Sequence, residues 1–464
     1  MVGSTFVFGS ELKTLFCYPG LTPEADETTW QEVLGISPAR TPGVGVFKGI
    51  SELKPAHQLT VSPEGLRIRR YWNVTSSPHT EDYPIAPDAV EHLRHLLSSA
   101  IRRQLVSDVP LCTLLSGGLD SSIITAVAAN AYQEWGLPPL ETYSFDYTDN
   151  QKYFKASSFQ PDADWPWVER MREEFGTDHR ILTCSQELLV SLLGAAVEAK
   201  DLPGMADLDS SLLYFCSQIR QRHTVSLSGE CSDEIFGGYP WFHRADMLAA
   251  DTFPWSMDIT ARTDVFRPEV VERLQLEDYV KWRYQESVAE TPRLEGETEA
   301  EARRREIGWL NLNWFMTNLL DRKDRMSMYS GLEVRVPFCD HHLVDYVWNI
   351  PWEMKSRGGI RKQVLRDAAA GILPEDVRNR PKSPYPKTHN PLFERLAREK
   401  LRAILRRPDA PIHSLVDTQT LEDGLLRDAG DYGRPWFGQL MAGPQMIAYL
   451  IELNIWMERF GLSA

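Results

Sequence analysis

Two acidic, glycine-containing loops carry the side chains best suited to chemistry. The first, residues 114–122, reads Leu-Leu-Ser-Gly-Gly-Leu-Asp-Ser-Ser and lies between an apolar run and an alanine-rich stretch. Backbone N–H groups of such a turn, together with those of a helix N-terminus, form a cavity suited to phosphate oxygens. Glycines let the backbone approach the anion, and serine hydroxyls add donors. The loop residues expected around the phosphates are Ser116, Gly117, Gly118, Leu119, Asp120, Ser121 and Ser122.

This first loop differs from the common phosphate loop that ends in Gly-Lys-Ser or Gly-Lys-Thr, because no lysine follows its glycines. Its order, Ser-Gly-Gly-x-Asp-Ser-Ser, resembles the pyrophosphate loop of ATP pyrophosphatases, which cut ATP between its α- and β-phosphates. The alternative is a serine–glycine turn that merely caps a helix. Seven residues in this order after an apolar strand favour the nucleotide site.

The second loop, residues 228–239, reads Ser-Gly-Glu-Cys-Ser-Asp-Glu-Ile-Phe-Gly-Gly-Tyr and holds three carboxylates. Asp233 follows a predicted strand closely, as Asp120 does, so the two could share a Mg²⁺ that also bridges phosphate oxygens. The helix dipole favours a carboxylate at a helix start. We expect this structural role for Glu234 but not for Glu230. The two loops together predict a site for ATP and magnesium.

The negative charge of these loops and of ATP requires nearby cations, which two later segments supply. Residues 321–326, Asp-Arg-Lys-Asp-Arg-Met, are expected within a helix, where charge pairs three residues apart are commonly structural. Residues 379–386 hold three prolines around Lys382, which predicts a stiff loop that fixes the direction of the lysine. Composition alone leaves open whether Lys382 is catalytic.

The elements that must position these loops alternate between strand and helix. This alternation predicts a parallel sheet with helices on both faces, the α/β class, with ligands bound at the carboxyl ends of the strands. After Gly238 the pattern becomes largely helical. The expected strands are 111–115, 141–145, 180–183 and 224–227, and the expected helices are 90–105, 122–133, 167–175, 186–200 and 210–222.

The remaining organisation follows from composition. Residues 1–72 look like a small strand-rich unit, with strands at 5–8 and 43–47 and a hairpin at 58–71. Residues 73–87, rich in Ser, Thr and Pro, are expected to be a linker, and 88–464 a second domain.

Charge, hydropathy and cysteine spacing limit the protein's partners and location. The net charge of −15 argues against general binding to nucleic acids or anionic membranes. No window approaches 18 apolar residues, and a cytoplasmic protein is the default expectation. The six cysteines include no Cys-x-x-Cys pair, so neither a zinc site nor a disulfide framework is expected.

The acidic and basic segments together resemble the synthetase half of glutamine-hydrolysing asparagine synthetase. The resemblance covers most of residues 88–464, in the expected order, and implies the adenine nucleotide α-hydrolase fold, also called the PP-loop ATP pyrophosphatase fold. The supporting stretches are LLSGGLDSS (114–122), SGECSDEIFGGYPWF (228–242), DRKDRMSMYSGLEVRVPFCDH (321–341) and RPKSPYPKTHNP (380–391).

The resemblance implies a role for each site residue. A substrate carboxylate would attack the α-phosphorus of ATP, giving an acyl-adenylate and pyrophosphate, and an amine nitrogen would then displace AMP. Glu230 would be the general base for that nitrogen, and Lys382, assisted by Arg325, would stabilise developing negative charge. Asp324 and Glu333 would order the acceptor. The purine would be read near Leu114, Tyr147, Ser228 and Gly229, and Asp120 and Asp233 would hold Mg²⁺.

The N-terminal region departs from the family pattern. Members of this type begin with a glutaminase domain whose nucleophile is an N-terminal cysteine, whereas here Val2 follows Met1 and the first cysteine is Cys17. Residues 1–72 resemble the closing part of that domain, so we expect a truncated remnant without its own glutaminase activity. Cys231 stands where glycine is frequent in the family, and we interpret it as the marker of a branch.

The leading hypothesis is an amide synthetase with aspartate as the expected acceptor. Its nitrogen would be free ammonia, ammonia from a separate glutaminase subunit, or another amine. The alternatives are a natural-product amide or lactam synthetase of the same fold, and a non-catalytic remnant that binds nucleotide or a partner. A tRNA-modifying pyrophosphatase is disfavoured by the net charge of −15. The sequence leaves the oligomeric state open, a homodimer included.

Overall fold

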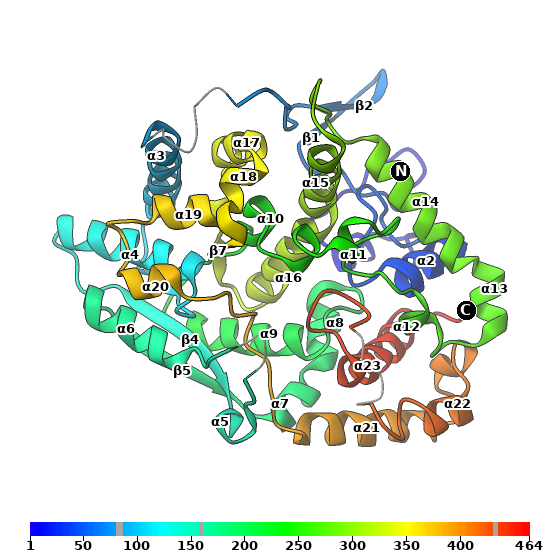
Figure 1. Ribbon diagram of the computed structural model, residues 1–464. Helices are drawn as coiled ribbons and strands as arrows, with labels where there is room; N and C mark the ends of the chain where they lie inside the picture. Colours follow the sequence, from blue (N-terminus) through cyan, green and yellow to red (C-terminus); the bar gives the residue numbers. More distant parts are fainter. Residues whose placement is uncertain (80–86, 157–160, 430–434) are drawn as a thin grey trace.

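A five-stranded parallel sheet forms the centre of the computed structural model, which describes residues 1–79, 87–156, 161–429 and 435–464 (Figure 1). The strand order is β5-β4-β3-β6-β7. The chain moves outward from β3 to β5 and returns to β6 on the other side of β3, so the topological switch point lies between β3 and β6. The strands are β3 (Leu111–Leu114), β4 (Glu141–Tyr147), β5 (Asp178–Cys184), β6 (Val225–Leu227) and β7 (Glu333–Arg335).

The expected α/β architecture is confirmed. All four predicted strands are present and parallel, and the helices between them fall where the apolar spacing placed them. The edge strand β7 was not predicted, because three residues in a charged segment carry too weak a pattern. The helices of this part are α3 (Pro87–Gln104), α4 (Leu119–Glu134), α6 (Trp165–Phe175), α7 (Gln186–Ser191), α8 (Leu193–Lys200), α9 (Asp207–Arg220) and α16 (Met316–Tyr329).

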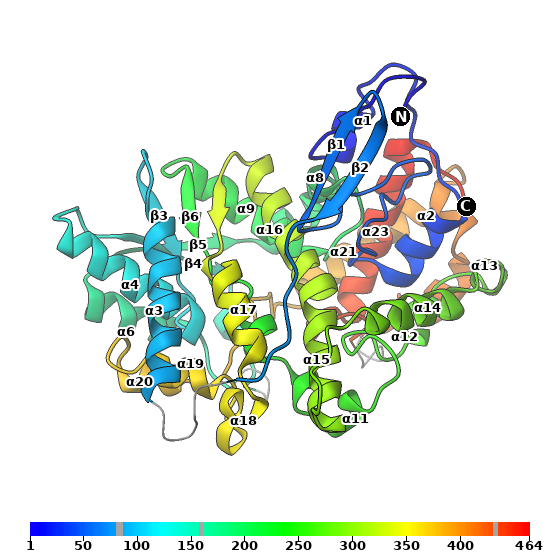
Figure 2. The same cartoon turned by 90° about the horizontal axis from the view of Figure 1, so that it is seen from above.

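Helices cover both faces of the sheet. Figure 2 shows α3, α4 and α6 on one side and α9 and α16 on the other. Alternate residues of β3 serve the two faces: Leu111 packs in the cluster that includes α4, and Cys112 in the cluster that includes α8 and α9. Because both faces are covered, the central strands are apolar on both sides.

The chain after β6 is largely helical, as expected, and it forms the second half of the molecule (Figure 1). The helix α23 is buried along most of its length. The main helices here are α10 (Ser232–Phe236), α13 (Pro268–Leu274), α14 (Leu276–Ala289), α15 (Glu299–Leu310), α17 (His341–Asn349), α18 (Trp352–Lys355), α19 (Gln363–Ala368), α20 (Glu375–Asn379), α21 (Leu392–Leu405), α22 (Thr418–Asp423) and α23 (Gly443–Phe460).

The N-terminal segment is less strand-rich than predicted. Residues 5–8 and 43–47 form no strands, only the isolated bridges Val2–Thr5 and Val44–Ser51. The backbone turns at Gly43 and Val46, whose φ angles of 94° and 66° lie outside the strand region.

Helix α2 (Glu27–Gln31) and the π-helical turn η1 (Glu32–Ile36) occupy this segment instead. Trp30 meets Trp456 of α23 edge-on at 5.8 Å, and the Tyr449 hydroxyl donates to the Val33 carbonyl at 2.6 Å. The segment is therefore packed into the C-terminal helical half.

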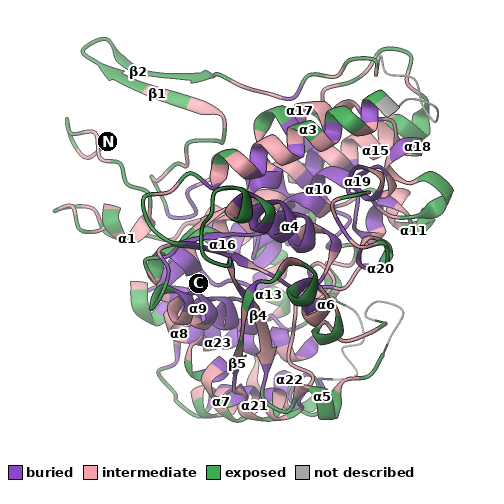
Figure 3. Ribbon diagram, turned by 90° about the vertical axis from the view of Figure 1, so that its left-hand side faces the viewer, coloured by how far each residue is buried: buried purple, intermediate pink, exposed green. Residues whose placement is uncertain are grey.

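The predicted hairpin is present as β1 (His57–Ser62) and β2 (Gly65–Arg70), and it projects from the body (Figure 3). Leu59 pairs with Ile68 and Val61 with Leu66, so these four apolar side chains share one face. Val61, Leu66 and Ile68 are about half exposed or more, at 48%, 50% and 60%. An isolated two-stranded hairpin is marginally stable in water, so packing of another polypeptide segment on this apolar face would stabilise the hairpin.

Residues 80–86 of the predicted linker lie outside the described residues. The part before it is attached to the body: Trp72 donates to Asp345 at 3.1 Å, and the Ser77 amide donates to Asn349 at 2.9 Å. Among the described residues, no helix combines the length and apolarity needed to cross a bilayer.

A disulfide joins Cys231 to Cys339, 108 residues further along the chain. The expectation that the cysteines carry no disulfide was wrong for this pair. Spacing rules detect cysteines close in sequence, whereas here the loop after β6 and the segment after β7 meet because β6 and β7 are neighbours in the sheet.

Candidate active site

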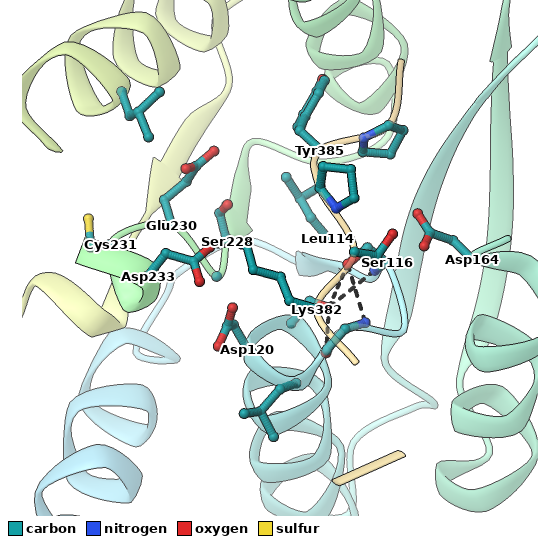
Figure 4. A pocket seen from close by; sticks show the side chains of 18 of the residues that line it. Leu114, Ser116, Asp120, Asp164, Ser228, Glu230, Cys231, Asp233, Lys382 and Tyr385 are labelled. Carbon is teal, nitrogen blue, oxygen red and sulfur yellow. Dashed lines mark hydrogen bonds and ion pairs between the residues drawn. The ribbon is translucent and has the colours of Figure 1, made fainter. Parts of the chain in front are cut away.

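A cavity of about 250 Å³ opens at the carboxyl ends of β3, β4 and β6 (Figure 4). Its walls are the turn after β3, the turn after β6, residues 380–386, and the side of α16 that holds Leu319 and Arg322. The carboxyl ends of parallel strands meet at one edge of a sheet, and a ligand crevice forms where the strand order reverses. The structure thus brings the two acidic loops together at this switch point.

The first loop leads directly into α4, as a phosphate site requires. Gly118 is the extended N-cap residue, and the free N–H groups of the first helical turn lie at the cavity. The Ser116 amide donates to Ser121 Oγ at 3.2 Å, and Ser121 Oγ donates to the Gly118 carbonyl at 3.2 Å. These bonds hold the turn in shape and leave its inner side open to a ligand.

Two glycines are required by close packing. Gly117 has a φ of 68°, and a Cβ placed there would lie 2.5 Å from the Cβ of Trp167. A Cβ on Gly229 would lie 3.0 Å from the Ser121 amide nitrogen. The absence of a side chain at Gly117 lets the first loop approach α6, and its absence at Gly229 lets the two loops approach each other.

A cluster of two carboxylates and two lysines lies at the centre of the cavity. Lys362 Nζ contacts Asp120 Oδ2 at 2.7 Å and Asp233 Oδ1 at 2.5 Å. Lys382 pairs with the other oxygen of Asp233, and Ser232 Oγ donates to Asp120 at 2.7 Å. Figure 4 shows Asp120, Asp233 and Lys382 converging from three separate segments.

The lysines set the charge of this cluster. Burial alone would raise the pKa of Asp233, but Lys362 and Lys382 lower it well below the ordinary carboxyl value. Burial and the nearby Asp233 charge raise the pKa of Glu234 to about 8, and Tyr239 donates a hydrogen bond to it at 2.6 Å. The surroundings thus favour the ionised form of Asp233 and the neutral form of Glu234.

The cluster offers carboxylate ligands for magnesium from two residues. Asp120 and Asp233 present carboxylates, the ligands this cation prefers, but the Lys362 ammonium lies between them. No group of three or more His, Cys, Asp or Glu side chains within the described ranges could hold a metal. The donor set therefore fits magnesium only together with further oxygens, such as those of a phosphate chain.

Glu230 lies on the acceptor side of the same cavity. Its Oε1 is 3.1 Å from Nζ of Lys323, a buried residue of α16. Glu230 lies one residue from Cys231, whose φ of 77° and disulfide hold the turn in position. This carboxylate is partly exposed to the cavity, as a group that accepts a proton from a ligand must be.

The proline-containing loop is held over the first loop by Arg380. This buried guanidinium donates to the Ser116 carbonyl at 3.0 Å and pairs with Asp164 at 2.6 Å. The anchoring fixes the loop that carries Lys382, and Tyr385 of the same loop lies beneath the Arg322 guanidinium at 4.7 Å.

Most of the predicted site residues line this cavity. Those that line it are Leu114, Ser116, Gly118, Leu119, Asp120, Ser121, Ser228, Gly229, Glu230, Asp233 and Lys382.

Three predicted nucleotide-binding residues lie behind the wall instead. Gly117 packs on Trp167, Ser122 is fully buried in α4, and Tyr147 donates its hydroxyl to the Pro386 carbonyl at 3.0 Å. On β4 the side chains at the cavity come from Tyr143, Ser144 and Phe145, nearer the middle of the strand.

Three predicted catalytic or acceptor residues also lie elsewhere. Arg325 donates to the Ser10 carbonyl at 2.7 Å and pairs with Asp324, which is 55% exposed. Glu333 lies at the amino end of β7, paired with Arg335 at 2.7 Å, on the sheet edge opposite the cavity. Helical spacing explains the first case: Leu319, Arg322 and Lys323 share one face of α16, and Arg325 is on another.

Sequence reasoning missed several cations that line the cavity, and Lys323 and Lys362 are the two that contact its carboxylates. Lys323 belongs to the segment 321–326, where the choice of Arg325 ignored the helical period. Lys362 ends the run Arg357-Gly-Gly-Ile-Arg-Lys, whose paired glycines before two basic residues could have marked it as a cationic turn.

Comparisons with known proteins identify the family of the chain. Residues 92–458 match the asparagine synthase family model, and residues 1–72 match the glutamine amidotransferase domain model. The chain is 52% identical to asparagine synthetase (glutamine-hydrolyzing) 3 of Bacillus subtilis, over 99% of this chain and 74% of that protein. It is 26% identical to asparagine synthetase (glutamine-hydrolyzing) 1 of the same organism, over 92% and 70%.

A more distant relative is amidase chry2 of Gibberella zeae, 27% identical over 73% of this chain and 58% of that protein. The family match spans both acidic loops, the α16 face and the proline-containing loop that enclose the cavity. The chain therefore belongs to the asparagine synthase family of ATP-dependent ligases that form carbon–nitrogen bonds.

Proposed function

We propose that this cavity adenylates a carboxylate, aspartate being the expected acid, and transfers ammonia to the acyl-adenylate. A carboxylate oxygen attacks the α-phosphorus, the bond to the β-phosphate oxygen breaks, and pyrophosphate leaves. The ammonia nitrogen then attacks the acyl carbon, and the carbon–oxygen bond to AMP breaks. The observation that supports this most directly is a single cavity with the Asp120–Lys362–Asp233–Lys382 cluster on one side and the Glu230–Lys323 pair on another.

The lysines would act on the phosphate side. Magnesium, held by Asp120 and Asp233 together with phosphate oxygens, would neutralise charge on the leaving pyrophosphate. In the structure, Lys362 and Lys382 pair with these carboxylates. When ATP binds, its phosphate oxygens would offer the two ammonium groups alternative partners in the same cavity. A buried cation that exchanges a carboxylate for a phosphate keeps its charge compensated, and Lys382 can then stabilise developing negative charge.

Glu230 would act on the nitrogen. After attack on the acyl carbon, the nitrogen carries a positive charge and must lose a proton before the amide forms. Glu230 lines the cavity and accepts a contact from Lys323 with only one carboxylate oxygen, which leaves the other for that proton. Arg322 and Lys323, the cations on this wall, fit a carboxylate acceptor such as aspartate.

We further infer that the nitrogen arrives as ammonia made elsewhere, and that this chain lacks its own glutaminase activity. Cys17 is the single cysteine in residues 1–72, and its thiol donates to the Lys13 carbonyl at 3.4 Å. The hairpin face formed by Leu59, Val61, Leu66 and Ile68 would suit the sheet of a glutaminase polypeptide. In this proposal residues 1–72 are the remnant of the glutaminase domain, and 88–464 form the PP-loop synthetase domain.

The test measures pyrophosphate and AMP from the purified chain with ATP, Mg²⁺ and aspartate, with ammonium or with glutamine. We expect release with ammonium and none above background with glutamine. Glu230→Gln should lower amide formation by a factor of about 10²–10⁴, while Glu269→Gln, an exposed residue of α13, should leave it unchanged. Activity equal in Glu230→Gln and the unaltered chain would refute the assigned base, and absence of release with every acid would indicate a non-catalytic remnant.

A further inference from the structure

A second cavity, of about 290 Å³, lies on the other side of α10 from the nucleotide cavity. It is enclosed by α15, α17, α18 and the loop before α15, the group of helices around α10 in Figure 1. Glu234 lines both cavities, so α10 is their common wall. None of the chemistry proposed above uses this second space.

Two cations face this cavity without a full set of partners. The side-chain ammonium of Lys355, at the end of α18, makes no hydrogen bond or ion pair with any residue in the described part of the chain. Burial, reinforced by the Arg305 guanidinium, lowers the pKa of Lys355 to about 7. Arg304 lies over the Trp352 ring at 5.0 Å, and its buried Nε has no hydrogen-bond partner among the described residues.

The carboxylates nearby are already engaged or lie in solvent. Glu297 pairs with Arg305 at 2.7 Å, and Glu301 accepts hydrogen bonds from Thr298 at the start of α15. Glu234 accepts a hydrogen bond from the Tyr239 hydroxyl at 2.6 Å, and Glu295 is exposed. Since a partly buried cation without a counterion is costly, the cavity favours a negatively charged ligand.

The other lining residues indicate what kind of ligand the cavity would accommodate. Trp348 and Trp352 contribute ring surfaces, and Val344 and Ile350 contribute aliphatic surface. Aromatic and aliphatic walls around a few placed charges are typical of sites for small organic ligands. A bare inorganic anion would leave this apolar surface uncovered.

We propose that the second cavity binds a small organic carboxylate with an apolar or aromatic body, its carboxylate held by Lys355 and Arg304. The occupant would touch Ile235 of α10 and Gly237 directly after it, and Asp233 of the same helix pairs with the two lysines of the nucleotide cavity. Binding there is coupled to ATP binding, and the coupling acts equally in both directions. The coupling rests on the proposed function, whereas the binding does not.

The binding test is calorimetric titration of the full chain with benzoate and indole-3-acetate, with benzamide and inorganic phosphate as comparisons. We expect at least one of the two carboxylates to bind at millimolar concentration or below, and benzamide, which lacks the charge, not to bind. Lys355→Met should weaken binding at least tenfold, and Lys355→Arg should restore it. Lys281→Met, an exposed residue of α14, is the matched control and should bind as the unaltered chain does.

Failure of both carboxylates to bind, or equal binding by Lys355→Met, would overturn the proposal. If inorganic phosphate competes as strongly as the carboxylates, the proposal that the ligand binds through an apolar or aromatic body is refuted. If a carboxylate binds through Lys355 while pyrophosphate is never released, the second cavity is supported as a carboxylate site and the proposed function is refuted. If pyrophosphate is released normally while neither carboxylate binds, the proposed function stands and the second site is refuted.

Discussion

Removal of the Cys231–Cys339 cross-link should destabilise the protein and disturb the second acidic loop. The link spans 108 residues, so its loss frees the unfolded chain from a closed loop of that length. The chain-entropy relation gives about 4.8 kcal/mol at 25 °C for such a loop, and measured disulfides deliver about 2–4 kcal/mol. We expect a loss of about 2–5 kcal/mol in the free energy of unfolding.

Loss of the disulfide should also affect the candidate active site. Cys231 separates Glu230 from Ser232, the residue whose hydroxyl donates to Asp120 at 2.7 Å. Without the link, the left-handed backbone at Cys231 loses a tether to the segment after β7. Amide formation should therefore fall more in Cys339→Ser than in Cys17→Ser, which alters an exposed free thiol.

The assay compares urea unfolding of the air-oxidised chain before and after treatment with a dithiol reductant. The reductant should lower the stability of the unaltered chain and leave Cys339→Ser unaffected. Thiol titration in denaturant should find four free cysteines before reduction, namely Cys17, Cys112, Cys184 and Cys216. Titration of all six cysteines of the chain before reduction, or stability that is indifferent to the reductant, would refute the reasoning.

Three further substitutions test the packing and charges of the site and core. Lys362→Met leaves Asp120 and Asp233 without their shared cation, so stability should fall by about 3–5 kcal/mol in urea unfolding and ATP binding should weaken; unchanged stability would show that the ammonium is not required there. Gly117→Ala should cost more than about 1 kcal/mol and abolish pyrophosphate release, because its Cβ would clash with Trp167. Gly136→Ala, with a similar φ of 66° and open space around it, is the control and should keep activity. Burial raises the pKa of Asp207 to about 6. Ionisation of this carboxyl therefore lowers the free energy of unfolding as pH rises through about 4 to 6, and the loss is complete above that range. Asp207→Asn should therefore be more stable than the unaltered chain by up to about 3 kcal/mol near pH 8, with the difference vanishing near pH 4; a constant difference across pH would contradict the assignment.

Local sequence determined the elements that have strong, short-range signals. The strand at 111–114, the glycine turn after it and the α4 helix appear as predicted, because apolar runs, glycines and helical spacing act through neighbours in the chain. The same reasoning placed Asp120 and Asp233 correctly at strand ends. It was wrong for residues 5–8 and 43–47, where valine and phenylalanine favour a strand but only isolated bridges form, and in the second stretch positive φ angles break the extended backbone.

The sequence by itself thus determined the α/β class, both acidic loops and the presence of a cationic proline-containing loop. Tertiary structure decided which cations line the cavity: Lys323 instead of Arg325, and Lys362 from a segment without strong signals. It also decided the Cys231–Cys339 link and the burial of residues 27–36 against α23. These outcomes depend on contacts between segments far apart in the chain, and the order of strands in the sheet, which local pattern does not encode, brings such segments together.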